Sequence, residues 1–264
     1  GSDLENQDHD AYTPLLLAAA KGNVEVTQIL IEAGANIMAQ EKTAKGIVYL
    51  CAETNEVDVL RLILNHPKAK ELIELPNIYD DTPLHIAAKN GHSEIVKLLL
   101  ENGAKVSSKN EKERTPFHNA AKYGRLRIAR HLLEHVPSLV SERDEDGSSA
   151  IHLAAASGHV ALLELLLNAG AAVDCRNCMQ WTPLDCAAAS GHRGCVEFLL
   201  ENNSPVDPVD INHGTFGTIQ QGCNAEQESR ASQADYVSKL RFWAALSVTW
   251  QLSMPKNWPV HHDL

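Results

Sequence analysis

The thiols are the side chains of this chain best suited to chemistry. Cys175 and Cys178 form a Cys-x-x-Cys pair, with Cys186 and Cys195 downstream. Four thiolates can hold a zinc ion if they converge to about 2.3 Å from it. A single thiol becomes reactive if it is exposed and a nearby cation such as Arg176 lowers its pKa. Cys175 and Cys178 are therefore candidate reactive thiols, and ordinary surface or buried thiols are the alternative.

A second group with chemical potential is the basic cluster of Arg127, Arg130 and His131. Their spacing of i, i+3 and i+4 places them on one face of a predicted helix. The chain as a whole is acidic, with a formal net charge of −11. Such a cluster is either a solvated outer face or an anion-binding site, for example for an inositol phosphate or a lipid headgroup.

Other catalytic patterns are absent from the sequence. It contains no Gly-rich phosphate loop, no Ser nucleophile elbow and no His-Glu-x-x-His. Asp144-Glu145-Asp146-Gly147 resembles the start of a calcium loop, but position 12 of that loop would be Ala155 instead of Glu. We expect no enzyme and no cofactor. The negative charge also argues against nucleic acid as a partner, because phosphate backbones attract basic surfaces.

The elements that must position these residues recur at a nearly constant interval. Equivalent positions fall at 13, 46, 82, 115, 149 and 182, and four of them begin a Thr-Pro-Leu or Thr-Pro-Phe sequence. A period near 33 residues predicts a solenoid, in which each unit buries its apolar face against its neighbours. The Thr-Pro-Leu-His signature at Thr82 is that of the ankyrin repeat. We predict an all-α ankyrin-repeat solenoid of about six helix-turn-helix repeats with hairpin fingers.

The third copy shows how one repeat is built. Thr82 fits the N-cap of a first helix, and Pro83 fits its first position. That helix should stop near Gly91, and a second should run from about Ser93 to Glu101. Gly103 follows as the left-handed residue that ends the second helix. The stretch from 105 to 114 then projects as a finger.

The predicted repeat architecture also determines whether the four cysteines could share a metal ion. Cys175 and Cys178 fall on a finger, whereas Cys186 falls on a first helix and Cys195 on a second helix. Because these places point in different directions, we expect no metal site. Resemblance to ankyrin arrays implies that His85, His118 and His152 bond a neighbouring finger and serve the scaffold. The same scaffold role is expected of the recurring His92, His159 and His192.

The repeats divide the chain into three parts. Residues 1–9 are a lead-in that opens on Gly1-Ser2, which we interpret as a cloning scar. The array covers 10–210, with repeats starting near 10, 43, 79, 112, 146 and 179. The connection over 65–77 holds three extra residues, either a tolerated insertion or a binding loop. Residues 211–264 are a divergent, irregular tail, partly disordered, with a helix over 236–252. This tail either caps the last repeat or is foreign to the array.

Partner-binding residues are expected just before each Thr-Pro and just after each Ala-Ala, on the concave face of the stack. Aromatic residues there are natural hot spots, because aromatics tend to supply interface energy. Plain surface is the alternative for each residue taken alone. The candidates are Tyr79, Asp81, Lys89, Asn90, Lys112, Arg114, Lys122, Tyr123, Asp146, Ser148, Met179 and Trp181.

Some stretches resemble one ankyrin-containing family more closely. Trp181-Thr182-Pro183-Leu184-Asp185-Cys186 and Ser204-Pro205-Val206-Asp207-Pro208 are similar to the cytoplasmic array of transient receptor potential channels of the ankyrin type, notably invertebrate members. The resemblance covers about 10–210. It implies a regulatory scaffold in a tetrameric sensory cation channel, with other channel subunits as partners and a plasma-membrane parent. In that family the reactive cysteines lie nearer the membrane, so the resemblance gives Cys175 and Cys178 no role.

The alternative is a soluble ankyrin adaptor that assembles protein complexes. Six cysteines in 264 residues are too few for a disulfide framework, which favours a reducing, cytoplasmic setting. No apolar run approaches the ~18 residues of a membrane span, so we expect no membrane insertion by this segment.

Overall fold

The computed structural model describes residues 3–202 and 204. The chain divides into two units, 1–205 and 206–264, and the described residues all belong to the first. The predicted tail over 211–264, its helix over 236–252 and both interpretations of it lie outside the described residues.

The described chain is helical, which confirms the predicted fold class. Six helix pairs follow one another. Their first helices are α1 (Pro14–Ala20), α3 (Ile47–Thr54), α6 (Pro83–Asn90), α8 (Pro116–Lys122), α10 (Ala150–Ala156) and α12 (Pro183–Ala189). Their second helices are α2 (Val24–Glu32), α4 (Val57–Leu64), α7 (Ser93–Glu101), α9 (Leu126–His135), α11 (Val160–Asn168) and α13 (Arg193–Glu201). The short helices α5 (Ala69–Leu72) and η1 (Pro137–Ser141) lie in connections.

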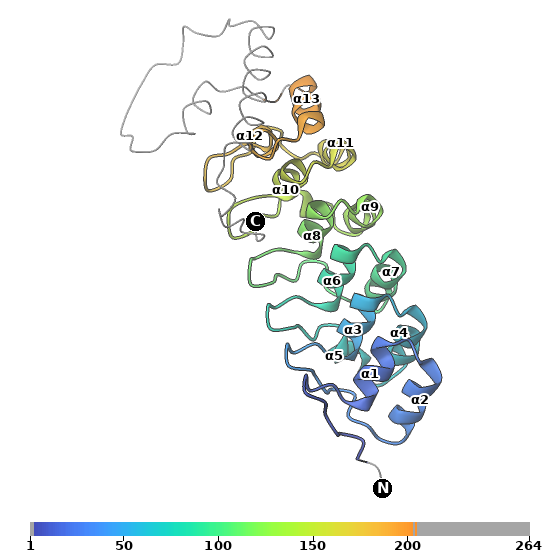
Figure 1. Ribbon diagram of the computed structural model, residues 1–264. Coiled ribbons are helices and arrows are strands. Elements are labelled where there is room, and N and C mark those ends of the chain that lie inside the picture. Colours follow the sequence, from blue (N-terminus) through green and yellow to red (C-terminus); the bar gives the residue numbers. More distant parts are fainter. Residues whose placement is uncertain (1–2, 203, 205–264) are drawn as a thin grey trace, which may run out of the picture. The chain divides into compact units, whose positions relative to one another are not determined.

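The helix pairs stack in sequence order, as Figure 1 shows. Each first helix packs on the first helices of the repeats before and after it, and the second helices do the same. We call these two rows the inner column and the outer column. The connections between repeats project as fingers from the side of the inner column. Burial of apolar surface between adjacent repeats therefore holds the solenoid together.

The helices begin and end where the sequence predicts. Thr82 caps α6 in a capping box with His85, so that two backbone N–H groups at the helix start are satisfied. The helix ends at Gly91, whose φ of 92° is in the left-handed region. Helix α7 covers the predicted range, and Gly103 after it has a φ of 91°. The predicted architecture of the third repeat is confirmed.

The long connection after the second repeat forms part of the packed structure. Its short helix α5 contacts α4 and buries Leu72 and Ile73, which are 1% and 2% exposed. Burying two large apolar side chains favours the interpretation of this segment as a tolerated insertion.

Candidate functional site

The fingers all close in the same way. In each one, a side-chain oxygen accepts hydrogen bonds from the backbone N–H groups two and four residues further on. In the third finger, Asn77 Oδ1 lies 2.9 Å from the nitrogen of Tyr79 and 3.0 Å from that of Asp81. The residues that do this are Asp8, Glu41, Asn77, Asn110, Asp144 and Asn177. Each stands five positions before a helix cap, a signal that the sequence analysis missed.

Backbone hydrogen bonds also join each finger to the next. Ile78 N–H donates to the carbonyl of Thr43 at 3.0 Å, and Glu111 N–H donates to that of Tyr79 at 3.1 Å. Equivalent bonds run from Lys42 to Asp10, from Glu145 to Lys112 and from Cys178 to Asp146. We call this series the finger ladder. It fixes the spacing of the finger tips without using any side chain.

Buried histidines connect the inner helices to the fingers. His118 Nδ1 accepts from the backbone N–H of Thr115, so its Nε2–H donates to the carbonyl of Glu142 at 3.1 Å. His85 and His152 do the same towards the carbonyls of Arg114 and Trp181. Burial lowers the pKa of all three, that of His118 to about 4, so the imidazoles are neutral at pH 7. The predicted scaffold role of these histidines is confirmed.

The smaller histidine series, at the turn inside each repeat, also serves the scaffold. His92, His159 and His192 each bond a carbonyl of the preceding repeat, at 2.9–3.1 Å. In the fourth repeat Arg125 takes this place, and its Nε–H donates to the carbonyl of Lys89 at 2.9 Å.

Two of the predicted partner-binding residues are buried, so the prediction that they are accessible was wrong. Arg114 Nε donates to Asp144 Oδ2 at 2.9 Å, and the two side chains are 10% and 0% exposed. Ser148 is buried, and its hydroxyl accepts from Asn177 Nδ2 at 3.3 Å. Both side chains face the adjacent finger instead of solvent, because their respective hydrogen-bonding partners, Asp144 and Asn177, belong to that finger.

The other ten candidates keep access to solvent. Tyr79, Tyr123, Asp146 and Met179 are exposed, and the remaining six are half-buried: Asp81, Lys89, Asn90, Lys112, Lys122 and Trp181. Ile78, which the sequence analysis missed, is 53% exposed beside Tyr79. We call these eleven residues the finger surface.

A tyrosine ring close to two lysine ammonium groups is the most distinctive arrangement on the finger surface. The ammonium groups of Lys89 and Lys122 lie 5.3 and 5.9 Å from the centroid of the Tyr123 ring. Cation–π contacts of this kind hold the ring and both charges in place. The arrangement can receive an apolar side chain on the ring and a carboxylate beside it.

The cysteines are dispersed. Cys178 is exposed on a finger tip, Cys175 is half-buried, and Cys186 and Cys195 are buried on α12 and α13. Burial raises the pKa of Cys175, which disfavours its thiolate, although Ser149 Oγ and His152 Nδ1 lie 3.8 Å from its sulfur. Of the two candidate reactive thiols, only Cys178 is exposed. Its reactivity stays a prediction. In the described chain, no three His, Cys, Asp or Glu side chains are grouped to hold a metal ion.

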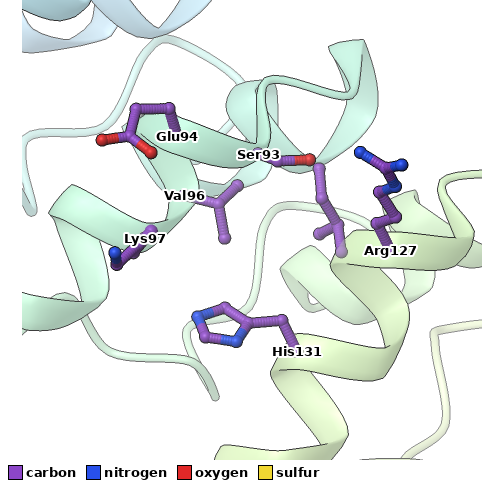
Figure 2. Close-up of a pocket in the computed structure, with 7 residues that line it drawn as sticks. Ser93, Glu94, Val96, Lys97, Arg127 and His131 are labelled. Atoms are coloured by element: carbon purple, nitrogen blue, oxygen red, sulfur yellow. The ribbon is translucent and has the colours of Figure 1, made fainter.

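The predicted anion-binding residues lie on α9, in the outer column. Arg127 and His131 line a groove between α7 and α9, together with Lys97 from α7, as Figure 2 shows. Arg130 is exposed on the same helix but does not line the groove.

Comparisons with known proteins agree with this architecture. A family model described as ankyrin repeats (3 copies) matches residues 1–73, 48–141 and 134–212. The solved structure of the ankyrin repeat domain of Bcl-3 is 31% identical, with a TM-score of 0.65, over 76% of this chain and 87% of that one. Of the residues described, no helix has both the length and the apolar character to cross a membrane.

Two curated relatives represent different kinds of protein. Bos taurus ankyrin repeat and SOCS box protein 3 is 34% identical over 64% of this chain and 32% of its own length. Homo sapiens transient receptor potential cation channel subfamily A member 1 is 30% identical over 38% of this chain and 9% of its own length. The matches to six curated relatives cover between 9% and 39% of the length of those proteins.

Proposed function

Since this chain belongs to the ankyrin-repeat family, we propose that it is a protein-interaction scaffold that binds a partner protein through the finger surface. One observation supports this most directly. Ile78, Tyr79 and Met179 are 53%, 51% and 62% exposed on finger tips that the finger ladder already holds in place. Large apolar side chains on a preorganised backbone can bind a partner with little loss of conformational entropy.

The chemistry of the finger surface indicates what the partner presents. The apolar tips require apolar or aromatic side chains opposite them. Lys89 and Lys122, whose ammonium groups lie 5.3 and 5.9 Å from the centroid of the Tyr123 ring, favour a carboxylate next to such a side chain. The partner segment is therefore apolar with acidic residues interspersed.

The test begins with identification of the partner. Proteins captured by the full chain from its source tissue would be identified and purified, and their affinity measured for single variants. Tyr79→Ala and Tyr123→Ala are each expected to weaken binding by about 2 kcal/mol, as for interface hot spots. Ile29→Ala is the matched control, because Ile29 is also a large exposed apolar residue, at 63%, but lies on α2 in the outer column. Equal losses in all three variants, or no loss in the tyrosine variants, would contradict the assignment.

A finer assignment concerns the protein to which the array contributes. We favour an adaptor that assembles protein complexes, because the matches to the SOCS box protein and to Bcl-3 cover 64% and 76% of this chain. A cytoplasmic array of a sensory cation channel is the second candidate. It is supported by the similarity to the human channel and by the stretch from Trp181 to Cys186. In that case the partners include other channel subunits and the parent lies in the plasma membrane.

The two assignments differ in how the native protein behaves on fractionation. An antibody raised against the array would follow it through extracts of the source tissue. An adaptor should leave the membrane pellet on washing with salt, whereas a channel should leave it only with detergent. Sequencing the transcripts that encode this array would provide the independent check, since a channel requires six apolar spans in the same frame.

A further inference from the structure

The second helices carry a pattern of charge that the scaffold does not require. At one repeat position, the second, third and fourth repeats have Arg61, Lys97 and Arg130, whereas the fifth and sixth have Glu164 and Glu197. Because equivalent residues of adjacent repeats lie next to one another in the outer column, the three cations form a basic row. Three neighbouring outer helices of an acidic chain thus each carry an exposed cation at the same repeat position.

The fourth repeat departs from its neighbours at two further positions. Arg127 stands where the second and third repeats have the carboxylates Asp58 and Glu94. His131 stands where they have the apolar residues Leu62 and Leu98. Since leucine serves at this position in the neighbouring repeats, packing of the array does not require a histidine at 131. Both departures line the same groove.

This groove lies between α7 and α9 and has a volume of about 240 Å³. Val96 and Ile128, which are 0% and 2% exposed, give it an apolar floor. Figure 2 shows Arg127 and His131 on one helix, facing the helix that carries Ser93 and Lys97. The polar lining of the groove comes from two repeats: Arg127 and His131 from the fourth, and Ser93, Glu94 and Lys97 from the third.

The carboxylates in and near the groove lie beside basic side chains. Glu94 pairs with Arg61 of the preceding repeat. Glu101 and Glu134 lie 3.9 Å from Lys97 and 3.6 Å from His131, respectively. Neither Arg127 nor Arg130 has a carboxylate of the described residues within 4.0 Å. Two guanidinium groups therefore face solvent without a counter-charge from the described part of the protein.

We propose that the groove between α7 and α9 binds a phosphate group of a polyphosphorylated ligand, either a soluble inositol polyphosphate or the headgroup of a phosphoinositide lipid. A phosphomonoester carries about −1.5 to −2 charges and presents three acceptor oxygens. The planar guanidinium of Arg127 can donate two parallel hydrogen bonds to it. Lys97 adds a point charge from the opposite helix, and a second phosphate of the same ligand can reach Arg130.

This site is separate from the partner-binding surface. The groove lies between α7 and α9 of the outer column. The fingers project from the side of the inner column, as Figure 1 shows. Failure of one proposal therefore does not affect the other.

Calorimetry of the full chain with inositol hexakisphosphate tests the soluble ligand. Sedimentation with phosphatidylcholine vesicles, with and without phosphatidylinositol 4,5-bisphosphate, tests the lipid. Arg127→Gln and Lys97→Gln should each weaken binding about tenfold or more, the usual effect of losing a charge-assisted hydrogen bond. Arg193→Gln is the matched control, because Arg193 is exposed on the outer helix α13, outside the groove, and its loss changes the net charge equally.

Saturable binding of inositol hexakisphosphate that depends on Arg127 and Lys97 supports a soluble ligand. Binding only to the vesicles with the phosphoinositide, with the same dependence, supports the headgroup. Absence of binding to both probes would overturn the proposal. Equal weakening by Arg193→Gln would overturn it as well, because binding would then follow net charge alone. All three variants alter exposed side chains, and circular dichroism would verify that each is folded.

Discussion

At the scale of single residues, the buried imidazoles connect stability to pH. His118 is folded in its neutral form, and its pKa is lowered from 6.5 to about 4 by burial. The unfolded chain therefore binds this proton first as the pH falls. The contribution of His118 to stability is complete above about pH 6.5 and is lost as the pH falls towards 4. His85 and His152, whose pKa values are shifted in the same direction, add to the loss.

We therefore predict that the free energy of unfolding decreases from pH 7 to pH 4, by about 3 kcal/mol for His118 alone. Urea unfolding at several pH values measures it. His118→Gln should give a flatter pH dependence than the parent chain, although the variant is less stable at pH 7. His135→Gln removes an exposed histidine and controls for loss of an imidazole elsewhere. An unchanged slope in His118→Gln would contradict the assignment.

The buried ion pair gives a second residue-scale prediction. Arg114→Ala removes the cationic partner of Asp144, whose side chain is 0% exposed. We expect a loss of about 3–5 kcal/mol in the free energy of unfolding, as for other uncompensated buried charges. Arg193→Ala also breaks an Arg–carboxylate pair, but one whose side chains are 84% and 55% exposed, and should cost less than about 1 kcal/mol. Similar costs for the two variants in urea titrations would refute this reasoning.

These residues also show where inference from the sequence ends. Tyr79, Tyr123 and Met179 were predicted to be accessible from repeat position alone, and they are. Arg114 was predicted on the same grounds and is buried, because its partner Asp144 belongs to the next finger. Repeat position specifies where a Cα atom lies. The direction of a long side chain depends on contacts with the neighbouring repeat, which one repeat's sequence does not contain.

At the scale of elements, helices and fingers differ in how well the sequence predicts them. Thr82, Gly91 and Gly103 act through local backbone geometry, so the approximate bounds predicted for helices α6 and α7 agree with the structure. The finger closures depend instead on a side-chain oxygen and two backbone N–H groups, with chemically different residues such as Glu41 and Asn177 in the same role. A pattern that accepts three residue types is hard to recognise before the structure shows its purpose.

Each finger turns at a left-handed residue, and only one of the six is glycine. Ala11, Ala44 and Gln180 adopt φ of 65°, 60° and 63°, whereas the fifth finger has Gly147 at 69°. A Cβ atom on Gly147 would lie 2.8 Å from Cys178 Sγ and 3.0 Å from its backbone nitrogen. Glycine is therefore required by the close approach of the next finger more than by the turn.

Gly147→Ala should consequently destabilise the chain by about 1–2 kcal/mol, although alanine occupies the same place in two other fingers. Gln180→Gly, at the equivalent position of the sixth finger, should change stability by less than about 1 kcal/mol. Thermal unfolding of the two variants side by side measures the difference. If alanine at 147 were as well tolerated as glycine at 180, the fingers would be less closely packed than described.

At the scale of the whole array, stability is expected to vary along the stack. Val26 and Ile29 on α2 are 47% and 63% exposed, while the equivalent Ile95 and Leu98 on α7 are 0% and 6% exposed. The same apolar positions are thus buried by neighbouring side chains in the third repeat and exposed to solvent in the first. A repeat packed on one side has about half the stabilising interface of a repeat packed on both.

We therefore predict that amides of α2 exchange with solvent faster than those of α7, with opening free energies lower by at least about 1 kcal/mol. Hydrogen exchange of the full chain, followed by mass spectrometry, resolves the two helices. Equal protection throughout would mean that the repeats open as one cooperative unit. The sequence could not have given this gradient, because Val26 and Ile95 are both apolar and differ only in what covers them.

The finger ladder has a mechanical consequence. Each of its joints is a single backbone hydrogen bond between neighbouring tips, for example from Ile78 to Thr43, and it lies beside an interface shared by only two repeats. When a chain built this way is stretched, load concentrates on the outermost joint, so repeats detach in turn. Each detached repeat releases about 33 residues, or on the order of 110 Å of extended chain. We therefore expect the array to lengthen in nearly equal steps under tension.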